Sequence, residues 1–231
     1  MSLATTFGSG GAEPYARALR GHTGALLYLH EFRPGARRRG ARPAAIEMNV
    51  DRWNADADLV DRTLLASVRG PVLDVGCGPA RMVRAAAELG LGVLGIDVSP
   101  AAIEIGRAAQ LPVALCSVFD AEVPGAGTWQ TVLLVDGNIG IGGDVTALLA
   151  RCAELAVADG EIVVEVHADP RRDRTFLGQL ADAHGERSAS FPWAEIGAEG
   201  LLRRAAGLGL VARQCWSADG RTFCRLAKSR A

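Results

Sequence analysis

Hydrophobic and polar positions follow a regular pattern from Pro71 onward. Short runs of branched apolar residues are separated by longer segments in which apolar residues recur every three or four positions. Continuous apolar runs are typical of strands buried on both faces, and the three-to-four spacing is typical of amphipathic helices. The pattern therefore predicts a parallel sheet covered by helices.

The limits of these segments can be read from their turn residues. Strands are expected at 72–75, 93–97, 112–116, 131–136 and 161–167. Helices are expected at 79–89, 100–109, 145–156 and 198–206. In the last quarter, runs 210–216 and 221–227 are joined by Asp219-Gly220, which favours a hairpin turn. We therefore predict an α/β fold of three layers, in which a Rossmann-like, seven-stranded, mostly parallel sheet ends in an antiparallel C-terminal hairpin.

The residues before this sheet alternate between apolar and polar positions. Segments 25–32 and 45–51 have this pattern, and an arginine-rich stretch, Arg33 to Arg42, lies between them. Alternation of period two predicts strands with one exposed face, so a small hairpin is expected here. A helix capped by Asn54 is expected over 55–68.

The difference between this N-terminal pattern and the pattern from Pro71 onward predicts that the chain has two parts. Residues 1–65 are expected to form an N-terminal lid with the helix that leads into the core, and residues 66–231 the core itself. The charge-rich stretch 168–192 has no clear period and is expected to be a loop over the site.

Composition narrows the class of protein. The chain has 231 residues, is 49% hydrophobic and carries a net charge of −1, so it can bury one full core and does not resemble a general nucleic-acid binder. It has neither a long apolar run nor a signal-peptide pattern, which predicts a cytoplasmic protein that does not insert into membranes. The five cysteines are scattered without a CxxC pair, so we expect small core residues rather than disulfides or a zinc site.

The stretch VLDVGCGPAR at 72–81 carries the strongest chemical signal. A buried strand ends in Gly76 and Gly78, two glycines that allow a sharp turn and a close approach of a ligand. Asp97 ends the next strand about 20 residues later, where it can bond the two hydroxyls of a ribose. A dinucleotide fingerprint would need a third glycine where Arg81 stands, so NAD is disfavoured and a nucleoside of another kind is expected.

This acidic-x-Gly-x-Gly pattern resembles motif I of the class I S-adenosylmethionine-dependent methyltransferases, and the C-terminal hairpin agrees with that superfamily. The resemblance covers roughly residues 50–227. The stretches VLDVGCGPAR, LGIDVS, SVFD, LLVDGNIGIGGD, EVH and FPWAEIG are similar to a group of bacterial small-molecule methyltransferases within it.

The resemblance implies a set of cofactor contacts. The residues it places against S-adenosylmethionine are Asp74, Gly76, Cys77, Gly78, Asp97, Val98, Ser117, Val118, Asp136 and Gly137. Asp74 would hold the amino group, Asp97 the ribose, and Val98 the adenine. Ser117 departs from the family pattern, which has an acidic residue there, so its hydroxyl would bond the adenine amine without charge assistance.

Residues after the fourth and fifth strands, and in the lid, are candidates for the chemistry. Asp136 and His167 are the catalytic candidates, with His167 as a possible base. The candidates for binding the acceptor are Asn138, Tyr15, Tyr28, His30, Trp53 and Trp193. Each also has a structural interpretation: Asp136 and Asn138 as turn residues, the histidines as ordinary hydrogen-bonded residues and the aromatic residues as packing. No metal is expected, because Asp136 and Asp144 have no clear third ligand.

The sequence thus predicts a methyltransferase that uses S-adenosylmethionine to methylate O or N, and less favourably C, of a small molecule, with secondary metabolism as the expected setting. One alternative is a protein that binds the same cofactor without transferring its methyl group. Another is a nucleic-acid methyltransferase that uses the arginine stretch, although no Asn-Pro-Pro-Tyr-like element follows the fourth strand. The sequence gives no indication of oligomeric state.

Overall fold

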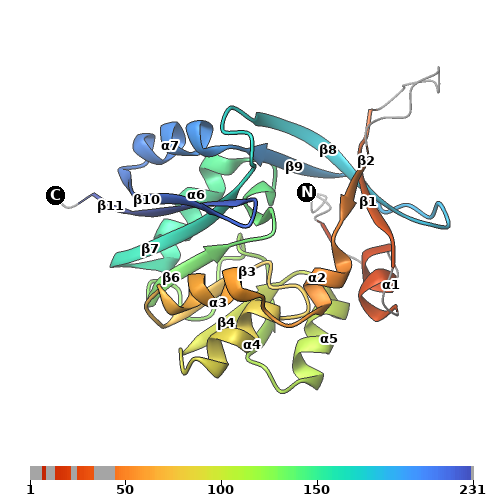
Figure 1. Cartoon of the computed structure of the whole chain (residues 1–231), viewed down its shortest axis with the longest axis horizontal. Coiled ribbons are helices and arrows are strands. Elements are labelled where there is room, and N and C mark those ends of the chain that lie inside the picture. The colour runs from red at the N-terminus through yellow and green to blue at the C-terminus, as the bar shows by residue number, and fades with distance from the viewer. Residues whose placement is uncertain (1–6, 9–13, 22–24, 34–44, 230–231) are drawn as a thin grey trace.

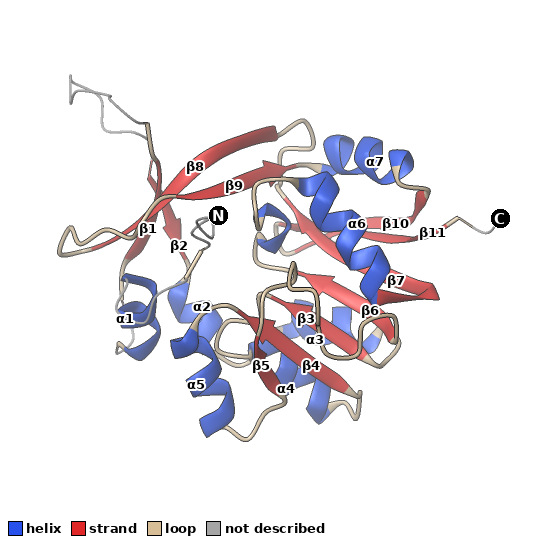
Figure 2. Cartoon of the chain, turned by 180° about the vertical axis from the view of Figure 1, so that it is seen from behind, coloured by secondary structure: helices blue, strands red, loops and turns tan. Residues whose placement is uncertain are grey.

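The structure is a computed structural model that describes residues 7–8, 14–21, 25–33 and 45–229. It contains two sheets, which Figures 1 and 2 show from opposite sides. Most of the arginine-rich stretch lies outside the described residues.

The main sheet has seven strands. They are β3 (Val72–Val75), β4 (Val93–Asp97), β5 (Val113–Leu115), β6 (Trp129–Leu134), β7 (Ala156–Val166), β10 (Leu210–Ala218) and β11 (Arg221–Lys228). Their order across the sheet is β10-β11-β7-β6-β3-β4-β5. Neighbouring strands from β7 to β5 are parallel, whereas β11 is antiparallel to both β7 and β10. The predicted mostly parallel sheet with an antiparallel C-terminal hairpin is therefore confirmed.

Helices cover both faces of this sheet. The helices are α1 (Pro14–Arg20), α2 (Val50–Asn54), α3 (Leu59–Ala66), α4 (Arg81–Glu88), α5 (Pro100–Ala108), the short 3₁₀ helix η1 (Asn138–Gly140), α6 (Val145–Leu155) and α7 (Ala198–Gly207). Along β6, Val132 and Leu134 pack with α6 and α7, whereas Leu133 packs with α3 and α4 on the opposite face. Because both faces are buried, this strand has no polar alternation, and that explains its continuous apolar run.

The second sheet, which we call the cap sheet, stands beside the carboxyl ends of the main strands (Figure 1). Its strands are β1 (Leu27–Glu31), β2 (Ala45–Met48), β8 (Asp173–Asp182) and β9 (Phe191–Ile196). Their order is β2-β1-β8-β9, and all pairs are antiparallel. The N-terminal hairpin is present, and its strand β1 also pairs with β8 from far along the chain.

Two expectations about local structure were wrong. The stretch 168–192 is not one loop, because it contains all of β8 and the start of β9, and β8 pairs with both β9 and β1. Because this stretch is rich in charged residues, we expected no regular structure in it. In the structure, Arg174 and Glu195 stand opposite each other across the β8–β9 pair and form an ion pair. The division of the chain at residue 65 remains a prediction, and the cap sheet draws strands from both sides of it.

The helix expected over 55–68 also differs. Helix α3 begins at Leu59 with Asp58 as its N-cap, and Asp61 completes a capping box, whereas Asn54 ends the separate helix α2. The reciprocal bonds of the capping box satisfy two helix-end N–H groups, which is why the helix starts here.

The expectation that cysteines fill the core holds for Cys77, Cys152 and Cys224 but is wrong for Cys215, which is exposed.

Gly95 lies in the middle of β4, where two neighbouring side chains leave no room for a Cβ atom. A Cβ atom at this position would lie 2.6 Å from Val83 Cγ2 and 2.7 Å from Cys77 Sγ. Val83 belongs to α4 and Cys77 to the glycine turn, so Gly95 lets both lie directly on the strand.

We predict that Gly95→Ala lowers the free energy of unfolding by about 1–3 kcal/mol, because the added methyl group overpacks this contact. Gly92→Ala is the matched control, since its Cβ would lie 3.7 Å from the nearest atom, in Pro71. Urea unfolding of the two variants and the wild type measures the difference. Equal stability of the two variants would contradict the proposed close packing.

Candidate functional site

A cavity lies between the carboxyl ends of the central strands and the cap sheet. Including its open mouth it holds about 950 Å³, which is large enough for a cofactor-sized molecule. The core side is formed by the turns after β3, β4 and β6, and the cap side by Phe7, Tyr15, Met48, Trp53 and Trp193. This is the position at which open α/β sheets bind ligands.

The turn after β3 opens its backbone to the cavity. Gly76 and Gly78 have φ angles of +73° and +53°, a conformation that glycine adopts without strain. The N–H groups of Gly76 and Cys77 both donate to the carbonyl oxygen of Ile96 in β4. The turn is thereby fixed to the neighbouring strand, and it leads into α4.

Asp97 lies at the end of β4 directly beside this turn. One carboxylate oxygen accepts the N–H of Gly78 at 2.9 Å and the other accepts the N–H of Ser99 at 2.8 Å. Burial raises the pKa of Asp97, while these backbone bonds oppose the rise. Each oxygen keeps a lone pair for another donor. The carboxylate therefore lines the cavity in a fixed orientation.

Asp74, on β3, also lines the cavity but has an unsatisfied oxygen. Its side chain is 1% exposed, and Oδ1 has no hydrogen-bond partner among the described residues. Burial, with repulsion from Asp136 and Asp97, raises the pKa of Asp74 to about 8. A buried acceptor without a partner costs free energy, so this position suits a ligand that brings a cationic donor.

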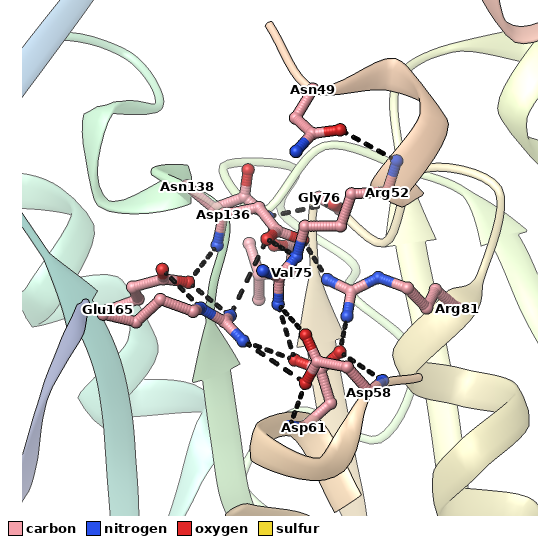
Figure 3. Close-up of polar contacts among 11 residues, drawn as sticks. Asn49, Arg52, Asp58, Asp61, Val75, Gly76, Arg81, Asp136, Asn138 and Glu165 are labelled. Atoms are coloured by element: carbon pink, nitrogen blue, oxygen red, sulfur yellow. Dashed lines mark hydrogen bonds and ion pairs between the residues drawn. The ribbon is translucent and has the colours of Figure 1, made fainter. Parts of the chain in front are cut away.

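Beside the cavity lies a cluster of ionic side chains, drawn in Figure 3. The arginine cluster, as we call it, consists of Arg52, Arg81 and Arg221 with Asp58, Asp61, Asp136 and Glu165. Sequence analysis did not identify it, since its members are spread from α2 to β11. Only the Asp58-x-x-Asp61 capping pattern offered a signal, and that pattern indicates a helix start rather than a cluster.

Asp61 is the centre of the arginine cluster. Its side chain is 0% exposed, and it contacts Arg81, Arg221 at 2.7 Å and Arg52 at 3.2 Å. Since each arginine comes from a different element, this one carboxylate connects α2, α4 and β11 to α3.

Asp136, a catalytic candidate, is held by the same cluster. Its carboxylate lies 2.5 Å from Arg81, and its backbone N–H donates to Glu165 at 2.7 Å. Arg221 in turn binds Glu165 through two bonds of 2.7–2.8 Å. Although burial raises the pKa of Glu165, the bonds from Arg221 and Asp136 bring it below its usual value. These contacts fix the turn after β6, where Asp136 has a φ of +54°.

Asn138 lies on that turn and faces the cavity. Its amide Nδ2 donates to the carbonyl oxygens of Val75 at 2.8 Å and Gly76 at 3.0 Å (Figure 3). Both donor hydrogens are used in this way, so Oδ1 remains as an acceptor. A Cβ atom on Gly76 would lie 2.9 Å from this amide, which shows how closely Asn138 covers the glycine turn.

Most of the other predicted residues also line the cavity. These are Cys77, Val98, Ser117, Val118, Tyr15, Trp53 and Trp193. The hydroxyl of Ser117 accepts the N–H of Phe119 at 3.2 Å, while its own N–H donates to Asp120 at 2.8 Å. Phe7 and Met48 line the cap side as well, and sequence analysis missed both because neither belongs to a recognisable motif.

Four predicted residues do not reach the cavity. Tyr28 and His30 lie on the face of β1 opposite to Leu27 and Leu29, whose side chains pack inward. His167 is exposed, and its Nδ1 accepts the N–H of Asp169 at 3.0 Å. Gly137 is also exposed and is absent from the lining. The expected role of His167 as a base therefore does not fit its position.

Two kinds of feature are absent from the described residues. No group of three or more His, Cys, Asp or Glu side chains is arranged to hold a metal ion. In the same part of the chain, no helix combines the length and the apolar character needed to cross a bilayer.

We predict that Asp61→Asn lowers the free energy of unfolding by about 3–5 kcal/mol, because it leaves buried arginines without their shared carboxylate. Asp56→Asn is the control, since Asp56 forms an exposed pair with Arg84 at 3.1 Å and should change stability by less than about 0.5 kcal/mol. Chemical unfolding monitored by tryptophan fluorescence compares them. A loss no larger than that of the control would contradict the central role of Asp61.

Comparison with known proteins identifies the fold. Residues 72–160 match the family model described as a methyltransferase domain. A SAM-dependent methyltransferase from Bacteroides fragilis, solved with S-adenosyl-L-homocysteine, is 22% identical with a TM-score of 0.75, over 94% of this chain and 93% of that chain.

Two other solved structures share the fold at lower similarity. The 1,6-didemethyltoxoflavin-N1-methyltransferase of Burkholderia thailandensis, solved with 1,6-didemethyltoxoflavin and S-adenosylhomocysteine, is 16% identical with a TM-score of 0.54, over 74% of this chain and 78% of that one. A sugar N-methyltransferase from a Streptoalloteichus species is 18% identical with a TM-score of 0.53, over 86% of this chain and 100% of that one. Residues 72–160 thus match a methyltransferase domain, and the chain that contains them has the fold of these solved S-adenosylmethionine-dependent methyltransferases.

Proposed function

We propose that this protein transfers a methyl group from S-adenosylmethionine to nitrogen or oxygen of a small molecule. The observation that carries the proposal is the pair of buried carboxylates, Asp74 and Asp97, on either side of a glycine turn that opens into the cavity. The solved methyltransferases of similar fold that bind S-adenosylmethionine or its product support the choice of cofactor.

The residues of the cavity fit the parts of this cofactor. Asp97 has lone pairs left for the two ribose hydroxyls, and the unsatisfied Oδ1 of Asp74 suits the cationic amino group. Val98 and Val118 provide apolar surface for the adenine, with the Ser117 hydroxyl beside them. When bound, the cofactor supplies a methyl group that its positively charged sulfur has already activated.

The contribution of the chain is alignment and exclusion of water, because the cavity offers no free general base among its described residues. Asp136 is bound by Arg81, and His167 lies outside. Burial, with the charge of Asp97, raises the pKa of Tyr15, and burial with Asp74 raises that of Cys77, so both stay protonated. Holding two reactants in the correct geometry can itself supply most of the required acceleration.

The size of the acceptor follows from the cap sheet. Trp193 on β9 and Met48 on β2 close the cavity from above the cofactor site, which leaves room for a small molecule. The related structures that carry a toxoflavin precursor or act on a sugar support this size class and a role in secondary metabolism. A protein that only binds the cofactor is the remaining alternative, and methyl uptake by an acceptor distinguishes the two.

We expect Asp97→Ala to weaken binding of S-adenosylhomocysteine by about tenfold or more, since it removes charge-assisted hydrogen bonds to the ribose. Glu104→Ala is the control, because Glu104 lies on the exposed face of α5 and pairs with Arg20. Isothermal titration calorimetry gives both affinities. Unchanged affinity in the Asp97 variant would argue against the ribose assignment.

Asp74 provides a test that depends on pH. The folded ligand-free protein keeps this proton up to about pH 8, whereas the unfolded chain loses it near the ordinary aspartate pKa of 3.8. The folded state therefore binds more protons between these values, and its stability falls as the pH rises through them. Asp74→Asn removes this slope. Its melting temperature relative to wild type should increase from pH 4 to pH 8, while its affinity for S-adenosylhomocysteine at pH 8 decreases.

Differential scanning fluorimetry across this pH range measures the first effect, and calorimetry at pH 8 measures the second. A constant difference in melting temperature would show that Asp74 is ionised throughout. Undiminished affinity would show that it does not hold the amino group.

A further inference from the structure

The cap side of the cavity is an aromatic wall, formed by Phe7, Tyr15, Trp53 and Trp193. The centroid of the Phe7 ring lies 5.0 Å from Tyr15, 5.2 Å from Trp193 and 6.5 Å from Trp53. Three of the ring pairs meet edge to face, at 68–81°. Rings that meet at such angles expose both ring edges and ring faces to the cavity. A flat aromatic ligand can therefore make edge-to-face or offset-stacked contacts with them.

Trp193 fixes this wall to the core. A Cβ atom at Gly140 would lie 2.6 Å from its indole ring, and Ile141 forms a β-bridge with Trp193. The indole therefore packs on the same turn that carries Asn138. The aromatic wall and the free Oδ1 of Asn138 thus line one cavity from adjoining positions.

The wall offers no partner for an anionic acceptor. Among the described residues that line the cavity, the cationic side chain is Arg81, which is 3% exposed and held by Asp61 and Asp136. A carboxylate or phosphate on the acceptor would therefore lose its hydration without gaining a counterion.

The described residues of the cavity include no free base. The acceptor atom must therefore be able to attack the methyl group without first losing a proton. A phenol keeps its proton near neutral pH, and an alkylamine is protonated, so both need a base before they can attack. An amine conjugated to an aromatic ring is a weak base that stays neutral and keeps its lone pair. Its N–H group can donate to the Oδ1 of Asn138.

We propose that the methyl acceptor is a neutral aromatic amine, with its amino group outside the ring, that lies against the aromatic wall and donates an N–H of this group to Asn138. This inference rests on the proposed function and specifies its substrate class. The nitrogen lone pair forms the new N–CH₃ bond, and the electron pair of the broken S–CH₃ bond stays on sulfur. The surplus N–H proton passes to water, because the methylated arylammonium is acidic.

The test uses four probes of similar size with the full chain. Calorimetry first establishes that S-adenosylhomocysteine binds, and failure at this step would contradict the proposed function rather than the substrate class. Ligand-observed NMR then measures dissociation constants of 2-naphthylamine, 2-naphthol, 2-naphthoate and decahydro-2-naphthol for the protein–S-adenosylhomocysteine complex. Mass spectrometry follows methyl transfer to each probe from S-adenosylmethionine.

We expect the amino and hydroxy probes to bind about tenfold more tightly than the carboxylate and the non-aromatic probe. Only the amino probe should gain a methyl group. Equal or tighter binding of the carboxylate or of decahydro-2-naphthol would overturn the proposal, as would methylation of the hydroxy probe in preference to the amino probe.

A matched pair of tryptophan variants locates the binding surface. Trp193→Leu should weaken binding of 2-naphthylamine about fivefold while S-adenosylhomocysteine still binds. Trp216→Leu is the control, because Trp216 stacks on Phe223 at 5.3 Å and does not line the cavity. Equal affinity for the probe in the two variants would overturn the role of the wall. If Trp193→Leu fails to fold, the comparison of the four probes on the wild-type protein still decides the proposal.

Discussion

The buried contacts of Asp61 with three arginines hold the site together. The arginines come from α2, α4 and β11, which are separate in the sequence. Arg221 also binds Glu165, and Glu165 accepts the backbone N–H of Asp136 in the turn after β6. Taking such charges out of water is costly, and the cost is offset only when each is paired in good geometry. The same contacts therefore define one arrangement of the chain and fix the turn that carries Asn138 beside Gly76.

The two sides of the cavity are built by different means. On the core side, the glycine turn, Asp74 and Asp97 are positioned by backbone hydrogen bonds of the main sheet. On the cap side, the aromatic wall is positioned by ring packing between segments with no shared hydrogen-bond ladder. Packed apolar side chains accept substitutions that conserve their total volume. The cap side of the cavity can therefore change its shape while the core side keeps its geometry.

Sequence reasoning succeeded where the signal is local. The position of Asp97 beside Gly78 follows from strand order and spacing alone, and so does the parallel sheet, because each buried strand is a continuous apolar run. It failed where the signal is distributed. Asp61 was not singled out, because its part in a capping box is a local pattern whereas its three arginine partners depend on tertiary contacts. Strand β8 was missed because its charged residues are paired only once β9 lies beside it, and His167 was placed correctly at a strand end but faces solvent.

The cap sheet also has a consequence for the order of assembly. Strand β1 is made early in synthesis, yet its partner β8 follows about 150 residues later, after five strands of the main sheet. Domains tend to fold as they emerge from the ribosome, and strands whose partners lie far along the chain pair late. The nascent chain can thus form the parallel strands of the main sheet while β1 still lacks its partner β8. The arginine cluster is completed later still, because Arg221 on β11 is synthesised after both β8 and β9.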